Sequence, residues 1–214
     1  MRRLPVYLLL DTSGSMSGEP IEAVKNGVKI LHSALRKEPA AMEVAYISVL
    51  TFDSDARQVV PLTEVASFTP PVIGASGGTS MGAALKLVTE CANREVVKNT
   101  PQAKGDWKPL VFIMTDGSPT DDVQRELPAF RSYKWGTVVA CAAGTSADTN
   151  VLRDIAKENI LYLDVTDGKA IASFFKWVSS SIAVSSKKAD AGSLKVGSID
   201  ELPPPPPEIT LMKF

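Results

Sequence analysis

Two short, uninterrupted apolar segments, 5–10 and 109–114, constrain the fold of this chain most strongly. Neither segment alternates apolar with polar residues, so each is expected to be a strand that is covered on both faces. Between the strand-like segments, apolar residues recur at helical spacing, as in the stripe that runs from Ile21 to Leu35. Strands that alternate with helices predict a mostly parallel sheet with helices on both faces.

The remaining apolar patterns complete this arrangement. Further strands are expected at 43–52, 56–62, 137–143 and 160–163, and further helices at 83–91, 149–157 and 171–182. The short polar turn at 53–55 predicts that the strands on either side of it form an antiparallel hairpin. The predicted fold class is therefore α/β: a doubly wound, mostly parallel sheet with one antiparallel edge strand and helices on both faces.

Composition changes near the C-terminus and divides the chain of 214 residues into two parts. Residues 1–185 are expected to form one domain, and residues 186–214 a flexible, proline-rich tail. The five prolines at 203–207 are typical of a polyproline II spacer. Because the last residues, 209–214, are largely apolar, we also hypothesise that they dock as an extended strand on the domain's own sheet edge or on a partner.

Charge and hydropathy exclude several classes of protein. The 23 basic and 24 acidic residues give a formal net charge of −1, without the basic excess that a nucleic-acid-binding surface usually shows. No run of apolar residues is long enough to cross a membrane, and the apolar N-terminal run is short for a signal peptide. With only two cysteines, both expected to be buried apolar residues, a cytoplasmic protein is predicted.

Oxygen-bearing side chains follow the two apolar strands. Asp11, Ser13 and Ser15 come directly after the first strand, and Asp116 follows the strand at 109–114. Thr79 lies in a glycine-rich loop before a helix. Ligands of parallel sheets bind beyond the carboxyl ends of the strands, and aspartates that end neighbouring strands would be roughly 5 Å apart. Because two such carboxylates repel each other and oxygen ligands suit a hard cation, this pattern predicts a Mg²⁺ or Mn²⁺ site.

These segments resemble the von Willebrand factor A domain and its metal-ion-dependent adhesion site. That family's pattern is an Asp-x-Ser-x-Ser loop, a Thr and an Asp on three loops, and it is matched in order by Asp11, Ser13, Ser15, Thr79 and Asp116. The resemblance covers roughly residues 4–183 and implies a Rossmann-like fold. Within the family, the compact loops look most like the bacterial tellurium-resistance proteins of the TerY type, which are encoded beside kinase-like and phosphatase-like proteins.

The resemblance implies a binding module and no enzyme: a cation held by the five residues would be completed by an Asp or Glu of a partner protein. It implies a role in a stress-response complex and leaves the oligomeric state open. The alternative is a Mg²⁺-dependent phosphatase of the haloacid-dehalogenase type, whose first strand also ends in an aspartate. Such an enzyme needs an acid two residues later, where this chain has Ser13.

Simpler interpretations apply to other polar and aromatic residues. Taken alone, Asp11 could be a helix cap, but capping requires no second carboxylate at the same sheet edge. Asp53 and Asp55 are expected to be turn residues, and Asp121 and Asp122 to be first-turn charges of a helix. The single histidine, His32, is expected to be exposed, which argues against a histidine-based triad or a zinc site. The aromatic residues at 174–177 are expected to belong to the core.

Overall fold

The computed structural model describes residues 2–164, 167–195 and 198–212 and confirms the predicted α/β class. Its sheet contains seven strands in the order β3-β2-β1-β4-β5-β6-β7. Five central strands are parallel, and β3 and β7 pair antiparallel at the two edges. The strands are β1 (Leu4–Asp11), β2 (Ala45–Phe52), β3 (Ala56–Glu64), β4 (Leu110–Thr115), β5 (Val138–Ala143), β6 (Ile160–Leu163) and β7 (Thr210–Leu211).

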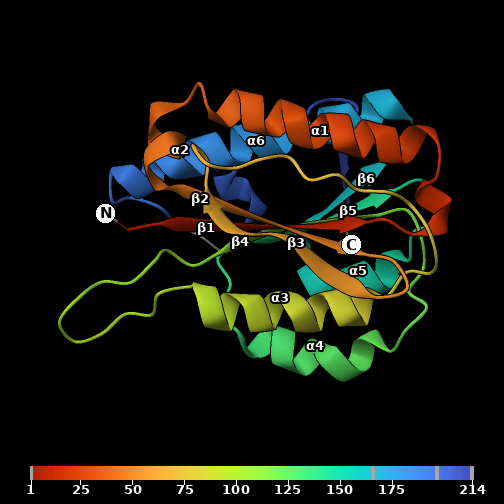
Figure 1. Ribbon diagram of the computed structural model, residues 1–214, viewed down its shortest axis with the longest axis horizontal. Coiled ribbons are helices and arrows are strands. Elements are labelled where there is room, and N and C mark those ends of the chain that lie inside the picture. The colour runs from red at the N-terminus through yellow and green to blue at the C-terminus, as the bar shows by residue number, and fades with distance from the viewer. Residues whose placement is uncertain (1, 165–166, 196–197, 213–214) are drawn as a thin grey trace.

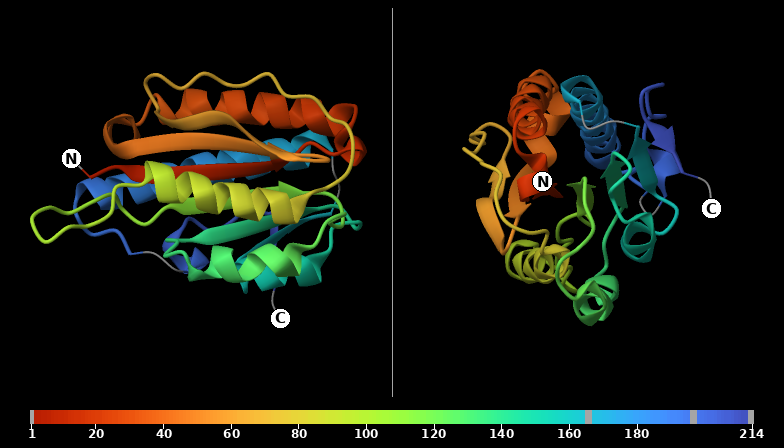
Figure 2. Two further views of the ribbon diagram at one scale, coloured as in Figure 1. Left: turned by 60° about the horizontal axis from the view of Figure 1, so that its bottom comes forward. Right: turned by 90° about the vertical axis from the view of Figure 1, so that its right-hand side faces the viewer.

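Helices cover both faces of this sheet. On one face lie α1, α2 and α6, and on the other lie α3, α4 and α5 (Figure 1). The views in Figure 2 show the same two layers from the side and along the strands. The helices are α1 (Glu19–Leu35), α2 (Pro39–Val44), α3 (Met81–Glu95), α4 (Val123–Ser132), α5 (Thr149–Ala156) and α6 (Gly168–Asp190), with short 3-10 turns η1 (Gly14–Met16) and η2 (Ile199–Glu201).

The two apolar runs are buried on both faces, as the sequence predicts. Every residue of β1 and of β4 is buried. Alternate side chains of β1 enter different cores: Leu8 and Leu10 pack on the side of α1 and α6, whereas Tyr7 and Leu9 pack on the side of α3 and α4. This explains why neither run alternates with polar residues, since both faces must exclude water.

Two local expectations differ from the structure. The segment before β2 is the short helix α2, so residues 43 and 44, expected in a strand, are helical. Pro39 at the first turn of that helix favours this conformation, because proline lacks the N–H group that a first turn leaves unpaired. His32 is half-buried rather than exposed: its ring packs on Phe68 at 5.3 Å, and its Nε2 lies 3.3 Å from the Val65 carbonyl oxygen.

The C-terminal segment is packed on the domain. The boundary expected after residue 185 lies inside α6, which continues to Asp190. The Trp177 indole donates a 2.8 Å hydrogen bond to the carbonyl oxygen of Pro203, so the proline run lies along α6. Beyond it, β7 pairs with Leu161 and Tyr162 and adds a second antiparallel edge strand, on the domain's own sheet. Residues 213 and 214, the end of the expected strand, lie outside the described residues.

Candidate metal centre

Asp11 ends β1 and is held in place by two hydrogen bonds. Its Oδ1 accepts the Ser13 N–H at 2.8 Å, and its Oδ2 accepts the Thr115 hydroxyl at 2.5 Å. The side chain is 1% exposed, and burial raises the pKa of Asp11 above its usual range, with a smaller contribution from the charge of Asp116. A buried carboxylate whose charged form is disfavoured in this way is a favourable ligand for a cation.

Ser13, Ser15 and Asp116 form a continuous chain of oxygen atoms. The hydroxyl oxygens of Ser13 and Ser15 lie 2.9 Å apart, and the Ser15 hydroxyl donates to Asp116 Oδ1 at 2.7 Å. Asp116 comes directly after β4, which pairs with β1 in the sheet. The expectation that the two aspartates end neighbouring parallel strands is therefore confirmed, and Ser15 links the two strand ends.

The chemistry of these oxygens fits a small divalent cation. Two hydroxyl oxygens and a carboxylate oxygen lie in a row at hydrogen-bond distances of 2.9 and 2.7 Å, at the same sheet edge as the buried Asp11. The described residues contain no cluster of three or more His, Cys, Asp or Glu side chains, so a cation here would depend on hydroxyl groups as well as the two carboxylates. Such a donor set suits Mg²⁺ or Mn²⁺.

Thr79 faces the same place from the loop before α3. A Cβ atom added to Gly117 would lie 3.5 Å from Thr79 Oγ1 and 3.9 Å from Ser15 Oγ, so both hydroxyls border the backbone of Gly117. The backbone of Thr79 is fixed by Thr120, which accepts its N–H at 3.0 Å and donates to its carbonyl at 2.9 Å. All five residues predicted for the site therefore lie at one end of the sheet.

Backbone hydrogen bonds tie the loop of Thr79 to the loop after β1 and to the hairpin turn between β2 and β3. The N–H of Gly14 donates to the Gly77 carbonyl at 3.0 Å, and the N–H of Ser80 donates to the Asp53 carbonyl at 2.7 Å. Gly77 has a φ of +72°, and a Cβ at this position would lie 2.2 Å from Ser54 Oγ. Only glycine fits such a conformation and such a contact without rearrangement. The loop that carries Thr79 is thus set by short-range packing and does not require a bound cation to be placed.

Three supporting residues escaped the sequence analysis. Thr115 holds Asp11, Thr120 holds Thr79, and Asp121 accepts the N–H groups of Gly82 at 2.9 Å and of Ala83 at 2.8 Å. Asp121 thereby caps α3 from another loop, although it was expected to be a first-turn charge of its own helix. The only signal in the sequence was the polar run 115–122. Within this run, the sequence does not distinguish a residue that binds the metal from a residue that holds a metal ligand in place.

Other polar and aromatic residues behave more simply. Asp53 and Asp55 form the expected hairpin turn, in which Asp53 also pairs with Arg57 at 3.3 Å. Asp122 caps its own helix α4. The two cysteines are buried and free, and the aromatic residues at 174–177 belong to the core, both as expected. Within the described residues, no helix has the length and apolar character needed to cross a membrane.

Residues 6–177 match the family model of the von Willebrand factor type A domain. The chain belongs to this family. Domains of the type commonly bind a divalent cation at a metal-ion-dependent adhesion site and use it to bind proteins. In this von Willebrand factor A domain, the three loops that carry that family's ligand pattern are the three that meet here.

One relative is similar in sequence and another in fold. An uncharacterised protein of Synechocystis sp. is 32% identical over 123 residues, which are 54% of this chain and 26% of that protein. A von Willebrand factor type A structure from Catenulispora acidiphila has a TM-score of 0.64 at 18% identity and covers 86% of this chain and 43% of that one. This chain therefore spans less than half the length of these relatives.

Two further structures extend the comparison. The pilus adhesin SpaC of Lactobacillus rhamnosus GG has a TM-score of 0.68 at 14% identity, with 86% of this chain and 31% of that chain covered. The proximal thread matrix protein 1 of the mussel byssus, in a form with a zinc-occupied metal-ion-dependent adhesion site, has a TM-score of 0.57 at 21% identity and covers 83% and 46% of the two chains. At these identities the likeness concerns the fold.

Proposed function

We propose that this von Willebrand factor A domain is a metal-dependent protein-binding module. In this proposal Asp11, Ser13, Ser15, Thr79 and Asp116 hold one divalent cation, Mg²⁺ or Mn²⁺, and a partner protein completes its shell with an Asp or Glu. The observation that carries the proposal is the oxygen chain Ser13–Ser15–Asp116, which brings two hydroxyls and a carboxylate together at the ends of the paired strands β1 and β4. The bound cation would supply a positive centre that attracts a carboxylate.

The five residues have different parts in this proposal. Ser15 is exposed, so the side of the site that it borders is open to a partner. Asp11 is buried, and each of its oxygens already accepts a hydrogen bond, so it fixes the loop and contributes charge from beneath. The three hydroxyl ligands are neutral, and the two aspartates only balance a divalent charge. The protein therefore has no excess negative charge at the site that would repel a further carboxylate from the cation.

The same residues argue for a binding protein rather than a phosphatase. A haloacid-dehalogenase-type enzyme requires a general acid at position 13, and a serine hydroxyl cannot act as an acid near neutral pH. Here the Ser13 hydroxyl is in hydrogen-bond contact with Ser15. Phosphate release from p-nitrophenyl phosphate in the presence of Mg²⁺ tests the alternative directly. If the protein releases phosphate and Asp11→Asn abolishes that activity, the phosphatase hypothesis replaces the binding-module hypothesis.

We further propose that the partners belong to a bacterial tellurite or chemical stress-response complex in the cytoplasm and include kinase-like and phosphatase-like proteins. Support comes from the compact loops around Asp11 and Asp116, which resemble the tellurium-resistance proteins of the family. Candidate partners are best tested individually, purified and immobilised, with the domain applied in Mg²⁺ or in chelator. Retention that is equal in the two buffers would contradict metal-dependent binding.

Metal binding itself can be measured by isothermal titration calorimetry with Mg²⁺, Mn²⁺ and Zn²⁺. Zinc is included because it occupies the corresponding motif of the mussel protein. We expect one site in the wild type and a large loss of affinity in Thr79→Ala, which removes a ligand but leaves the backbone contacts of Thr79 in place. The matched control is Ser118→Ala, because the Ser118 hydroxyl is exposed and contacts only the Ser146 carbonyl. Equal affinities in both variants would remove Thr79 from the ligand set.

A further inference from the structure

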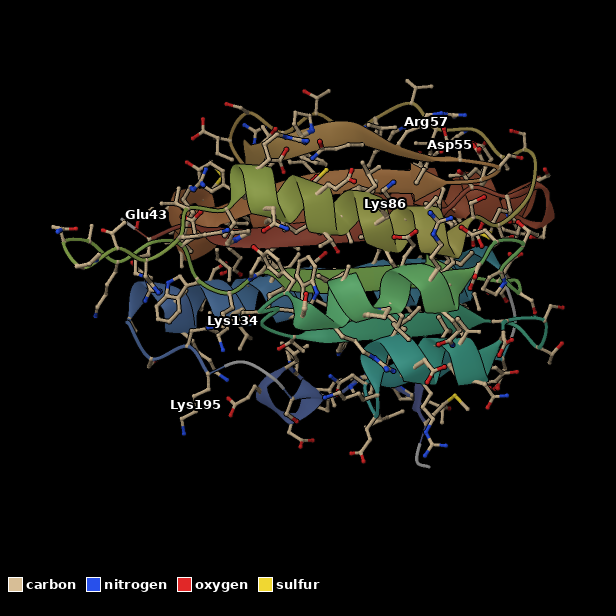
Figure 3. The ribbon with its side chains drawn as sticks, turned by 90° about the horizontal axis from the view of Figure 1, so that it is seen from below. Glu43, Asp55, Arg57, Lys86, Lys134 and Lys195 are labelled. Carbon is tan, nitrogen blue, oxygen red and sulfur yellow. The ribbon has the colours of Figure 1, made fainter. Side chains whose placement is uncertain are left out.

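A second polar site lies at the opposite end of the sheet, near the amino ends of β4, β5 and β6. It is a pocket of about 350 Å³, within the range of ligand-binding pockets. In Figure 3, Lys134 labels this end of the molecule, and Asp55 and Arg57 label the end that carries the candidate metal centre. The polar and aromatic side chains that matter for its chemistry are Lys108, Arg131, Tyr133, Lys134, Trp135 and Lys157.

The charged side chains that line this pocket are all basic, and we call it the basic pocket. Four basic residues line it, and its described lining contains no carboxylate. Arg131 pairs with Asp154 at 3.4 Å, but none of the three lysines has an ion pair with a described residue. The nearby carboxylate of Asp106 is used by Arg3 at 2.6 Å. Three of the four cations are thus without an ion pair to a described residue, although Asp154 and Glu158 lie beside Lys157 in the adjoining pocket.

Aromatic rings form one wall of the basic pocket and fix its shape. The rings of Tyr133 and Trp135 lie 4.2 Å apart, and the Trp135 indole donates to the Phe130 carbonyl at 2.8 Å. The Tyr133 hydroxyl donates to the Ala92 carbonyl, and burial raises the pKa of Tyr133 to about 12, with the charge of Asp106 contributing. The phenol therefore stays neutral, and the wall offers a half-buried aromatic surface beside the lysines.

The loops that carry the lysines are also fixed. Gly136 donates its N–H to the Pro109 carbonyl at 2.8 Å, and a Cβ at this glycine would lie 2.7 Å from the Lys108 carbonyl oxygen. This close approach brings the loop before β5, with Lys134, against the loop before β4, with Lys108. The cations are consequently held together by the backbone despite their mutual repulsion.

Lys157 adds an independent observation. Its φ is +58° and its ψ is −118°, and it is the one non-glycine residue with a positive φ among the described residues. The position follows the last turn of α5, where glycine would be the unstrained choice. Strained residues of this kind are concentrated at functional sites. Lys157 also lines the basic pocket, so its strained backbone adds to the case for a functional site here.

We propose that the basic pocket binds an acidic segment of a protein partner, with Asp or Glu carboxylates at the lysines and an apolar or aromatic side chain against Tyr133 and Trp135. A peptide is favoured over a nucleic acid because the cations form one concave cluster rather than a stripe, and the chain as a whole has a net charge of −1. The site is independent of the metal centre, so the domain would contact two partners at its two ends.

The test uses a fluorescein-labelled peptide, Gly-Glu-Glu-Phe-Glu-Glu-Gly, and measures its anisotropy with the full chain in chelator, which removes any contribution of bound metal. The control peptide has Gln in place of every Glu, and an oligothymidylate of equal charge tests for nucleic acid. The variants are Lys134→Gln, Lys157→Gly and their combination. The matched control is Lys86→Gln, an exposed lysine on α3 that lies away from the pocket (Figure 3).

We expect the acidic peptide to bind the wild type and Lys86→Gln equally, and the Gln peptide to bind neither. The double variant should bind about fivefold more weakly, which corresponds to about 0.5 kcal/mol for each removed cation at a solvated site. Lys157→Gly should also raise the temperature of unfolding, because glycine relieves the backbone strain at this position. Weaker binding by this variant could then not be attributed to unfolding. Equal binding by all variants, or tighter binding of the oligothymidylate, would overturn the proposal.

Discussion

The substitution Asp116→Asn tests the metal centre with the least disturbance of the fold. Asparagine has the same shape as aspartate, and its side-chain oxygen can still accept the Ser15 hydroxyl, now at 2.7 Å from Asp116 Oδ1. The change removes one of the two carboxylates that face each other across β1 and β4, and with it their repulsion. The metal-free variant should therefore be as stable as the metal-free wild type, or slightly more stable.

The size of the stabilisation by Mg²⁺ follows from the linkage between metal binding and folding. A cation that binds only the folded state stabilises it by about 2.7 kcal/mol when its concentration is 100 times the dissociation constant. For a chain of 214 residues, each kcal/mol raises the unfolding temperature by about 2–4 °C. Saturating Mg²⁺ should therefore raise the unfolding temperature of the wild type by about 5–10 °C. The loss of a charged ligand should abolish most of that increase in Asp116→Asn.

Thermal unfolding of both proteins by circular dichroism, in chelator and in Mg²⁺, measures this difference. The control is Asp55→Asn, the same substitution at an exposed turn on the same edge of the sheet, where the Asp55 carboxylate accepts the Ala56 N–H. It should leave the increase caused by Mg²⁺ intact. A wild-type increase that survives in Asp116→Asn would refute the assignment of Asp116. An equal unfolding temperature of the wild type in both buffers would refute the site.

Three further perturbations test other parts of the structure. Gly27→Ala should destabilise the fold by about 1–2 kcal/mol in denaturant unfolding, because the new Cβ would lie 2.1 Å from the Phe175 ring and overpacking outweighs the gain in helix propensity. In chelator, the wild type should gain stability relative to Asp11→Asn as the pH falls through the folded-state pKa of Asp11. Burial raises that pKa, so the penalty for the ionised form is fully present above it and is lost as the pH falls from it to the pKa of the unfolded state. Deleting residues 203–214 should lower the unfolding temperature and shift the fluorescence of Trp177 to the red, because its indole loses its hydrogen-bond acceptor and cover, while calorimetry should show unchanged metal affinity.

The central sheet and the position of the candidate site could be predicted because two physical rules leave few alternatives. Uninterrupted apolar runs indicate strands buried on both faces, and the structure buries all of β1 and β4. Parallel strands then place their carboxyl ends at one edge, so Asp11 and Asp116 had to meet if β1 and β4 were neighbours. Thr79 could be added because its loop leads into α3 at the same edge.

The docking of the last residues as an edge strand followed from their apolar character and agrees with β7, but the packing of the proline run and the supporting contacts could not be predicted, because they depend on tertiary packing alone. The strand β7 contains only two residues, and the segment before it is rich in proline, so no periodicity marks it as part of the sheet. Its position depends on an acceptor for the Trp177 indole, Pro203, which is 26 residues away. Asp121 caps α3 across a separation of 39 residues. Contacts of this kind have no local signature in a sequence.

The opposite charges at the two ends of the domain have a common cause in its topology. A helix that follows a parallel strand begins at the carboxyl edge of the sheet, and there Asp122, Asp148 and Asp167 cap α4, α5 and α6. The helix C-termini lie at the other end, where Lys134 and Lys157 follow α4 and α5. One fold thus places the oxygens of the proposed metal centre at one end and the basic pocket at the other. Binding at the first end should respond to chelator, and binding at the second to ionic strength, because screening weakens solvated charges.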